Sequence, residues 1–285
     1  MRLSHSSVRR FAAPTLLVGS LAACASATRP ATASSVSAAS PNASRAAACP
    51  AAATWSPAPP NRADSLTDYQ RSVDARNRND WASLTRYREA NASLGAPRPG
   101  ETRVVFMGNS ITDAWAKSFP TLFPGKSYVG RGISGQTTPQ MLVRFRQDVV
   151  VLQPKVVVIL AGINDIAGNT GPATQAMIAD NLMSMTEIAQ ANGIRVVLSS
   201  VLPAYDFPWR RGIGPAPKVV ALNEWIKCYA AQAGAVYLDY YGRMADARGG
   251  LSPELASDGV HPTEAGYRIM APLAEAAIQE ALRER

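Results

Sequence analysis

The stretch Lys155-Val156-Val157-Val158-Ile159-Leu160-Ala161 indicates the fold more strongly than any other part of the chain. After the lysine it is apolar without interruption. A continuous apolar run of this length is typical of a strand buried on both faces, as in a parallel sheet. Four further strands are predicted by apolar runs at residues 104–107, 127–129, 194–201 and 235–239.

Helical patterns separate or follow these strands, near residues 138–149, 173–192, 216–233 and 263–283. In the second of them, Ile178, Leu182 and Met185 recur at the spacing of one helix face. Alternating strands and helices predict a parallel sheet that is covered by helices on both sides. For residues 101–285 we therefore expect an α/β fold, a three-layer α/β/α flavodoxin-like sandwich with a sheet of about five strands.

The first 24 residues resemble an export signal, because a basic segment ending at Arg10 precedes an apolar stretch. Leu21-Ala22-Ala23-Cys24 is similar to a bacterial lipobox, in which the cysteine is lipidated and becomes the first residue of the mature protein. This interpretation predicts a lipoprotein anchored in a membrane and facing the periplasm or cell surface. An ordinary signal peptide cleaved after Ala27 also fits, and it predicts a soluble periplasmic or secreted protein.

Two segments are expected between the signal and the α/β domain. Residues 25–60 are mainly Ala, Ser, Thr and Pro, and such a sequence buries too little surface to order, which predicts a disordered tether. Residues 61–100 carry helix formers and predict a helical N-terminal extension that packs on the domain. In an oxidising compartment Cys49 and Cys228 form a disulfide or stay free thiols, since the sequence does not place their Cα atoms.

The charge of the chain does not indicate a nucleic-acid partner. The formal net charge is +8, but three of the 29 basic residues lie in the signal, which leaves 26 basic against 21 acidic residues. No long basic block is present among them. We expect a mildly basic, solvated surface.

Three polar, glycine-containing motifs each follow a predicted strand, and a fourth lies in a loop before the last helix. They are Gly108-Asn109-Ser110-Ile111-Thr112-Asp113, Gly132-Ile133-Ser134-Gly135, Gly162-Ile163-Asn164-Asp165 and Asp258-Gly259-Val260-His261-Pro262. Ligands of open α/β sheets bind at the carboxyl ends of the strands, so all four motifs could converge on one crevice.

His261 is the only histidine left once the signal, which contains His5, is removed. Asp258 stands three residues before it and can accept the Nδ1 proton of the imidazole. This fixes the tautomer and leaves Nε2 to take a proton from a serine. The pattern therefore predicts nucleophilic catalysis with a histidine base.

Neither a metal nor a cofactor is expected. A single histidine rules out the usual His-rich zinc site, and the cysteines lack ligand spacing. Residues 130–135 match the G-x-G-x-x-G pattern of dinucleotide sites, but they follow the second strand. The acidic residue expected about 20 positions further on is missing.

The four motifs, in this order over residues 103–285, resemble those of the SGNH hydrolases, also called GDSL esterases. Residues 132–138 resemble the bacterial branch related to platelet-activating-factor acetylhydrolases. The resemblance implies that Ser110 is the nucleophile and that Asp258 and His261 complete a catalytic triad. It also implies an oxyanion hole formed by Gly135, Asn164 and the backbone N–H of Ser110. Asn109 stands where the family more often has Asp.

This resemblance implies a serine esterase that works through an acyl-enzyme on a small-molecule or carbohydrate ester. The branch favours short acyl groups, so we expect deacetylation of a carbohydrate. A lipase or lysophospholipase at the membrane and a cell-wall O-acetyltransferase are the alternatives. The loop at 203–217 holds Tyr205, Trp209 and Arg210, which either bind a sugar ring or acyl chain or pack among themselves.

Overall fold

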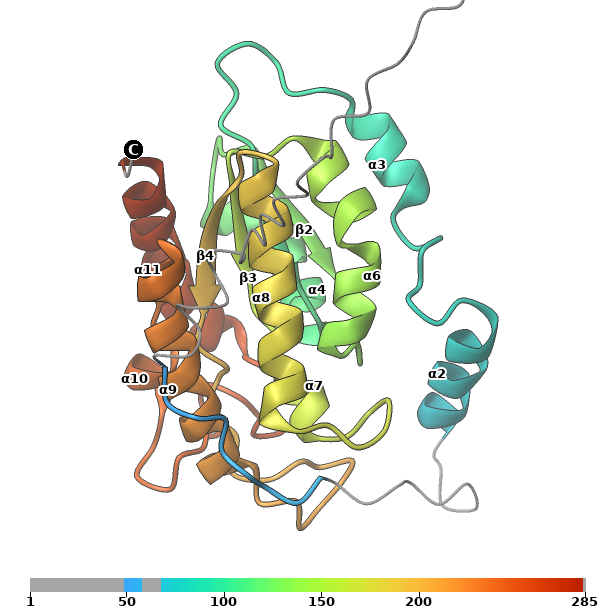
Figure 1. Ribbon diagram of the computed structural model, residues 1–285, viewed down its shortest axis with the longest axis vertical. Helices are drawn as coiled ribbons and strands as arrows, with labels where there is room; N and C mark the ends of the chain where they lie inside the picture. The colour runs from blue at the N-terminus through green and yellow to red at the C-terminus, as the bar shows by residue number, and fades with distance from the viewer. Residues whose placement is uncertain (1–48, 58–67, 284–285) are drawn as a thin grey trace, which may run out of the picture. The chain divides into compact units, whose positions relative to one another are not determined.

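The computed structural model describes residues 49–57 and 68–283 (Figure 1). The export signal, Cys24 and most of the expected tether lie outside the described residues. Among the helices of this part of the chain, none combines the length and the hydropathy needed to cross a bilayer.

Five parallel strands form one sheet in the order β2-β1-β3-β4-β5. The strands are β1 (Val104–Gly108), β2 (Tyr128–Gly132), β3 (Val156–Ile159), β4 (Arg195–Ser199) and β5 (Val236–Leu238). Val157 of β3 pairs with Val105 on one side and with Val196 on the other. The order is that of flavodoxin-like folds, and the predicted sandwich is confirmed.

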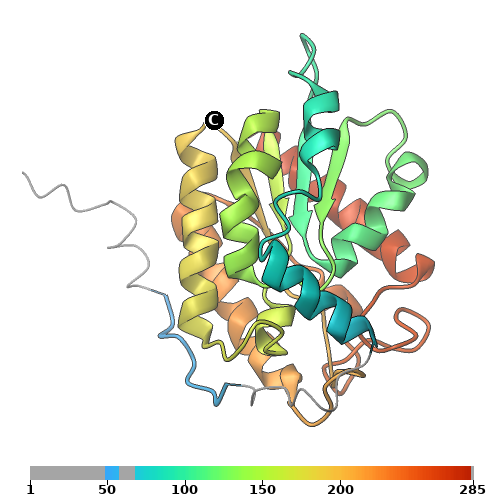
Figure 2. The same cartoon turned by 90° about the vertical axis from the view of Figure 1, so that its right-hand side faces the viewer.

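Helices cover both faces of the sheet, and Figure 2 shows the strands between two helical layers. One layer consists of α6 (Thr138–Asp148), α8 (Gln175–Ala191) and α9 (Pro215–Ala233). The other consists of α4 (Ser110–Trp115), α5 (Phe119–Leu122), α10 (Tyr241–Met244) and α11 (Glu264–Arg283). Three shorter elements lie in the connections, namely η2 (Ala116–Ser118), η3 (Val150–Leu152) and α7 (Ile163–Ile166).

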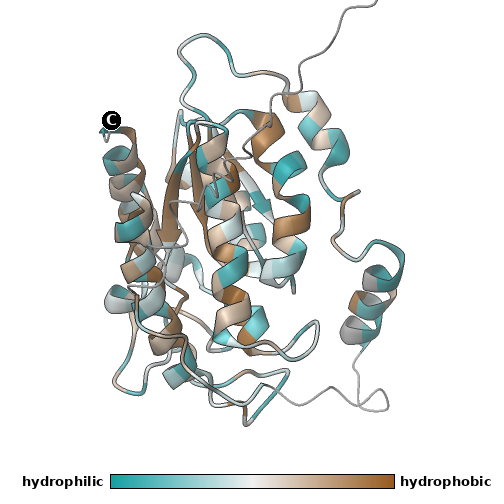
Figure 3. Cartoon of the chain, viewed as in Figure 1, coloured by the Kyte–Doolittle hydropathy of each residue, from teal (hydrophilic) through white to brown (hydrophobic). Residues whose placement is uncertain are grey.

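The sheet divides the core into two clusters because alternate strand residues point to opposite faces. Val105 and Met107 pack under α6, α8 and α9, whereas Val104 and Phe106 pack under α4 and α11. All residues of β1 are buried, and the central strands are brown in the hydropathy view (Figure 3). The sheet is therefore a rigid base for whatever follows its strand ends.

Aromatic packing fixes the helix that follows β1. Trp115 of α4 meets Phe106 edge-on at a centroid distance of 5.5 Å and stacks on Tyr267 of α11 at 5.6 Å. Such pairs contribute about 0.5–1.5 kcal/mol each beyond the area they bury. Because Ser110 is the first residue of α4, this packing also fixes the position of Ser110.

The expected N-terminal extension is helical in α2 (Asp68–Asn79) and α3 (Arg88–Leu94). Asn91 of α3 donates to the Gln147 carbonyl at 3.0 Å and to the Asp148 carboxylate at 2.7 Å. The Tyr87 hydroxyl donates to the carbonyl of Gly132 at the end of β2. The extension is thus attached to α6 and to one of the motif-bearing loops.

Residues 49–57 differ from the expected disordered tether, which was predicted to continue to Pro60. Cys49 is buried and forms a disulfide with Cys228 of α9, with their Cα atoms 5.7 Å apart. The Ala53 N–H donates to the Gln175 side chain at 2.9 Å. Trp55 donates its indole N–H to the Ala173 carbonyl at 3.1 Å. The disulfide is the first of the two alternatives that the sequence left open for Cys49 and Cys228, whereas the contacts of Ala53 and Trp55 were not predicted.

Candidate active site

Three of the four motifs meet at the carboxyl edge of the sheet. Ser110 follows β1, which lies between β2 and β3 in the sheet. Gly135 comes after β2, and Asn164 lies in α7 after β3. Parallel strands bring such loops to the same edge of the sheet, and ligands of these folds bind there, at the point where the strand order reverses.

Two glycines let α4 begin directly against the sheet. A Cβ atom on Gly108 would lie 2.0 Å from Thr112 Oγ1, and one on Gly132 would lie 2.1 Å from the Asp113 backbone nitrogen. Asn109 caps α4, because its side-chain oxygen accepts the Ile111 N–H at 3.3 Å. An uncharged amide is sufficient for this cap, which accounts for Asn at the position where Asp is more common.

Ser110, His261 and Asp258 form one hydrogen-bonded chain. Ser110 Oγ lies 2.8 Å from His261 Nε2, and His261 Nδ1 lies 2.6 Å from Asp258 Oδ2. The other carboxylate oxygen accepts the backbone N–H groups of Val260 at 2.9 Å and His261 at 2.7 Å. A carboxylate can only accept, so Nδ1 carries the imidazole proton and Nε2 accepts from the serine hydroxyl.

The surroundings of Asp258 favour its ionised form. Partial burial alone would raise its pKa, but the hydrogen bonds from the His261 ring and from the backbone of His261 and Val260 hold the pKa below the ordinary value. The carboxylate is therefore charged at neutral pH. It orients the imidazole and stabilises the positive charge that the ring takes up with a proton.

Gly135 and Asn164, the expected oxyanion-hole residues, lie on the segments that follow β2 and β3. Gly135 has a φ of +81°, a conformation that favours glycine, and its carbonyl accepts from Asn169 Nδ2 at 3.2 Å. Asn164 is buried and donates one side-chain proton to the Gln136 carbonyl at 2.9 Å. An amide group has two such protons, so Asn164 has a second one to offer to a ligand.

Asp165 joins these two loops and was not among the predicted site residues. Its carboxylate accepts the Thr138 N–H at 3.0 Å and the Thr138 hydroxyl at 2.6 Å, at the start of α6. Complete burial raises the pKa of Asp165 to about 7, although the hydrogen bonds from Thr138 oppose this. The sequence signal was its place directly after Asn164 in the third motif.

Arg144 is a second residue that the sequence did not single out. It is fully buried in α6, where it pairs with Asp148 at 3.0 Å. Its guanidinium also donates to the Gly108 carbonyl at 2.9 Å and to the Gln136 side chain at 2.5 Å. It thus ties the turn before Ser110 to the loop that precedes α6.

The aromatic loop after β4 divides into residues with different surroundings. Trp209 stacks on Phe207 at a centroid distance of 5.1 Å, and its ring lies 5.9 Å from that of His261. Tyr205 is exposed to solvent. Arg210, also expected in substrate binding, donates from Nη1 to the carbonyls of Ala167 and Gly168 and so holds the end of α7. This contact depends on which backbone groups lie near Arg210 in the fold, which the sequence does not show.

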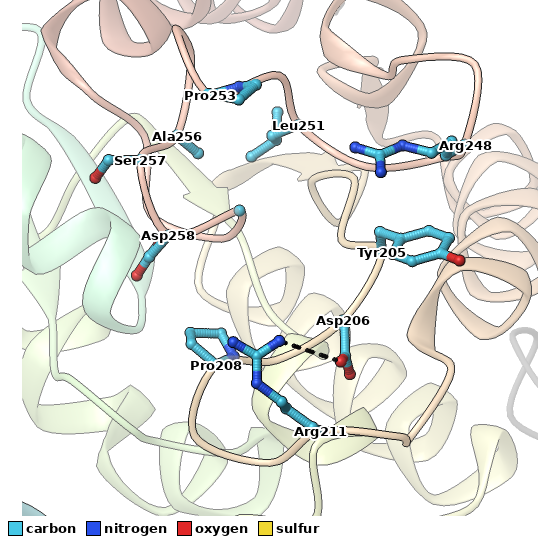
Figure 4. Close-up of a pocket in the computed structure, with 11 residues that line it drawn as sticks. Tyr205, Asp206, Pro208, Arg211, Arg248, Leu251, Pro253, Ala256, Ser257 and Asp258 are labelled. Carbon is cyan, nitrogen blue, oxygen red and sulfur yellow. Dashed lines mark ion pairs between the residues drawn. The ribbon is translucent and has the colours of Figure 1, made fainter.

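Two small cavities, each of about 210 Å³, border the motifs, one through Asp258 and Gly259 and the other through Asp113, Ile133 and Ser134. One lies between the loop after β4 and the loop that carries Asp258, and Figure 4 shows residues that line it. The other lies between the N-terminal extension and Ser134. Most of its lining is polar, including Arg76, Asp80 and Arg86.

Known proteins resemble the chain in sequence and fold. The model of the GDSL-like lipase/acylhydrolase family matches residues 106–269. The structure of a protein described as an acylhydrolase, from Bacteroides fragilis, is 47% identical with a TM-score of 0.69, covering 72% of this chain and 99% of that one. A GDSL-like lipase from Bacteroides thetaiotaomicron is 48% identical with a TM-score of 0.68, covering 71% and 100%.

A more distant structure shares the fold alone. An acetylxylan esterase from Geobacillus stearothermophilus is 21% identical with a TM-score of 0.51, covering 65% of this chain and 97% of that one. No curated protein matches the chain.

The chain belongs to the GDSL-like lipase/acylhydrolase family, since the family model matches more than half of it. The matched residues contain all four motifs. The protein is accordingly a carboxylic ester hydrolase of the SGNH/GDSL type. This confirms the enzyme class that the motifs implied.

Proposed function

We propose that the protein is a serine esterase that removes short acyl groups, above all acetyl, from carbohydrates by way of an acyl-enzyme. The observation that carries the proposal is the Ser110–His261–Asp258 hydrogen-bonded chain, together with a small cavity that borders Asp258 and is lined in part by Asp206, Arg211 and Arg248. Arginine and carboxylate side chains of this kind suit a hydroxyl-rich substrate.

In the first half of the reaction Ser110 Oγ attacks the ester carbonyl and its proton passes to His261 Nε2, 2.8 Å away. The carbonyl oxygen becomes an oxyanion, which accepts from the backbone N–H groups of Ser110 and Gly135 and from Asn164 Nδ2. One such donor is worth about 2.7–4 kcal/mol of barrier. His261 then gives its proton to the alcohol oxygen as the C–O bond breaks, which leaves an acyl group on Ser110.

In the second half a water molecule takes the place of the alcohol. His261 accepts one of its protons while the oxygen attacks the acyl-enzyme, and the same donors hold the new oxyanion. Collapse returns the proton to Ser110 and releases the carboxylic acid. Asp258 keeps its negative charge throughout, because it only orients and stabilises the imidazolium.

The preference for short acyl groups rests on the bacterial branch that residues 132–138 resemble, which favours them. Binding a long acyl chain gains about 0.8 kcal/mol for each CH₂ group transferred from water into apolar surroundings. A series of acyl chain lengths therefore measures how much apolar surface the acyl side of the site offers. The esterase from Geobacillus stearothermophilus supports only the point that this fold accommodates acetylxylan chemistry.

The test is a panel of p-nitrophenyl esters from acetate to dodecanoate, measured beside O-acetylated xylooligosaccharides. We expect kcat/KM to be highest for acetate and to fall with chain length, together with release of acetate from the saccharides. A rate that rises with chain length would indicate a lipase instead. Acetyl transfer to a sugar acceptor that outpaces hydrolysis would indicate an O-acetyltransferase.

We further propose that the protein is exported and anchored through a lipid on Cys24. The Cys49–Cys228 disulfide supports export, because such bonds persist in oxidising compartments. Cys24→Ser should move the protein to the soluble fraction while hydrolysis of small esters continues. A wild-type protein that is soluble and begins at Thr28 would instead indicate ordinary secretion.

A further inference from the structure

The direction in which the alcohol half of an ester must lie follows from the proton transfers. His261 Nε2 has to reach the alcohol oxygen to protonate it, whereas the carbonyl oxygen points to Gly135 and Asn164. The alcohol therefore extends toward the side of the site where His261, Asp258 and Trp209 lie. The cavity that borders Asp258, Gly259 and Pro208 is on this side.

This cavity has one aromatic wall and two arginines. Tyr205 is 56% exposed, and the Arg248 guanidinium lies 5.2 Å from the centre of its ring. Arg211 reaches the cavity from the loop after β4, where its Nη1 lies 3.9 Å from Asp206. Figure 4 shows the two arginine side chains entering from loops on different walls, with Tyr205 between them.

The wall that carries Arg248 is a preformed turn. Asp246 accepts the N–H groups of Arg248 and Gly250, each at 2.9 Å, and its own N–H donates to the Gly250 carbonyl at 2.8 Å. A Cβ atom on Gly250 would lie 3.0 Å from the Cβ of Tyr205, so glycine lets the turn pack against the base of that side chain. The position of Arg248 over the ring is thus built into the loop.

The charges in the cavity are paired. Arg211 has Asp206 beside it, and Arg248 has Asp246 at 3.4 Å. An anionic ligand would have to displace these carboxylates, whereas sugar hydroxyls can donate to the carboxylates and accept from the guanidiniums. An exposed aromatic face next to planar polar groups suits the apolar face and the hydroxyl rim of one sugar ring.

We propose that this cavity is the subsite for a neutral sugar ring of the alcohol half, with Tyr205 as the platform and with Arg248 and the Arg211–Asp206 pair as hydroxyl ligands. The inference rests on the proposed carbohydrate esterase function. The inference goes beyond the proposed function because it names the residues that select the alcohol. Arg210 has no part in the subsite.

The test compares kcat/KM for O-acetylated xylotriose with kcat/KM for p-nitrophenyl acetate in the same variants. Tyr205→Ala should lower the ratio of the two at least tenfold through a higher KM for the saccharide. Tyr205→Phe, which keeps the ring face, should restore most of it. Arg248→Met should lower the ratio about fivefold. Arg268→Met is the matched control, because Arg268 also pairs with a carboxylate at the surface, on α11.

An unchanged ratio in Tyr205→Ala and Arg248→Met would overturn the subsite while leaving the esterase proposal intact. If the wild type releases no acetate from saccharides, the proposed function fails and binding alone decides the inference. Xylotriose is then titrated into Ser110→Ala protein and followed by tryptophan fluorescence. Saturable binding that Tyr205→Ala abolishes supports the subsite, and the absence of binding overturns it.

Discussion

The two halves of the active site differ in how they are held. Asn164, the proposed oxyanion donor, and its neighbour Asp165 are buried and bonded to Gln136 in the loop before α6 and to Thr138 at the start of α6. Asp258 and His261, on the other side, stand in a loop with 36% and 37% of their side chains exposed. One half is fixed by the interior and the other is open to solvent.

The difference reflects what each half does. Donors that receive an oxyanion act best when they are already aimed and shielded from water, so burial helps them. A base must exchange protons with an alcohol and then with water, and it needs an approach for both. The Asp258 carboxylate keeps the exposed ring oriented without enclosing it.

The largest expected effect on kcat comes from removing the nucleophile Ser110 or the base His261. Ser110→Ala and His261→Ala should each lower kcat on the order of 10⁴–10⁶-fold, and the double variant should be scarcely worse, because the two residues act as a unit. Asp258→Asn should cost less than His261→Ala. Steady-state kinetics on p-nitrophenyl acetate measures this, with Ser184→Ala on α8 as the control. Multiplying losses in the double variant would contradict a shared mechanism.

Asp165 should make stability pH-dependent on the buried side. Its pKa of about 7 lies above the ordinary 3.8, so the folded state binds more protons between these values. The free energy of unfolding should therefore fall as pH rises from 4 to 8, by about 4 kcal/mol from this group, and stay level above. Urea unfolding of Asp165→Asn should lack this fall, whereas Asp180→Asn, at an exposed position, should keep it. If the free energy of unfolding depends on pH in the same way in wild type and Asp165→Asn, the raised pKa does not belong to Asp165.

Asn164→Ala should separate binding from catalysis in the buried half. Loss of one oxyanion donor lowers kcat about 10²–10³-fold, while KM stays nearly constant because the charge develops only during the reaction. The matched control is Asn192→Ala at the end of α8, which should behave as wild type. A rise in KM with an unchanged kcat would assign Asn164 to ground-state binding.

The smallest effect concerns Arg210, where the two halves meet. Arg210→Met removes hydrogen bonds to the Ala167 and Gly168 carbonyls and should lower the free energy of unfolding by about 1.5 kcal/mol. Hydrolysis of p-nitrophenyl acetate should fall by less than about threefold. Thermal denaturation and kinetics measure both, beside Arg268→Met. A large rise in KM for saccharide esters alone would restore Arg210 to the substrate site.

The sequence predicts the sheet well because buried parallel strands are continuous apolar runs. It also points to Ser110 and His261, since each lies in a short motif at a strand end or loop. The sequence does not predict contacts between residues that are far apart along the chain. Asp165 meets Thr138 and Arg144 meets Gly108 only through the packing of α6, and Arg144 with Asp148 four residues later has the pattern of a surface ion pair.

The same reason explains why the sequence does not separate the roles of residues in the irregular segments. Tyr205, Trp209 and Arg210 share one loop and one composition, yet they face solvent, the His261 ring and two backbone carbonyls respectively. Side-chain direction in a loop depends on its exact backbone path, which no periodicity encodes. The contacts of residues 49–57 depend in the same way on a disulfide partner far along the chain.

The Cys49–Cys228 bond closes a covalent ring that consists of residues 49–228. Ser110, Gly135 and Asn164 lie within this ring, whereas Asp258 and His261 lie in the part of the chain that follows it. A protease that cuts between Pro57 and Asp68 would open this ring without producing two molecules, because the bond still joins the pieces. Reduction would be required to separate them. The segment that begins at Cys49 would therefore stay joined to α9 after a break in the polypeptide.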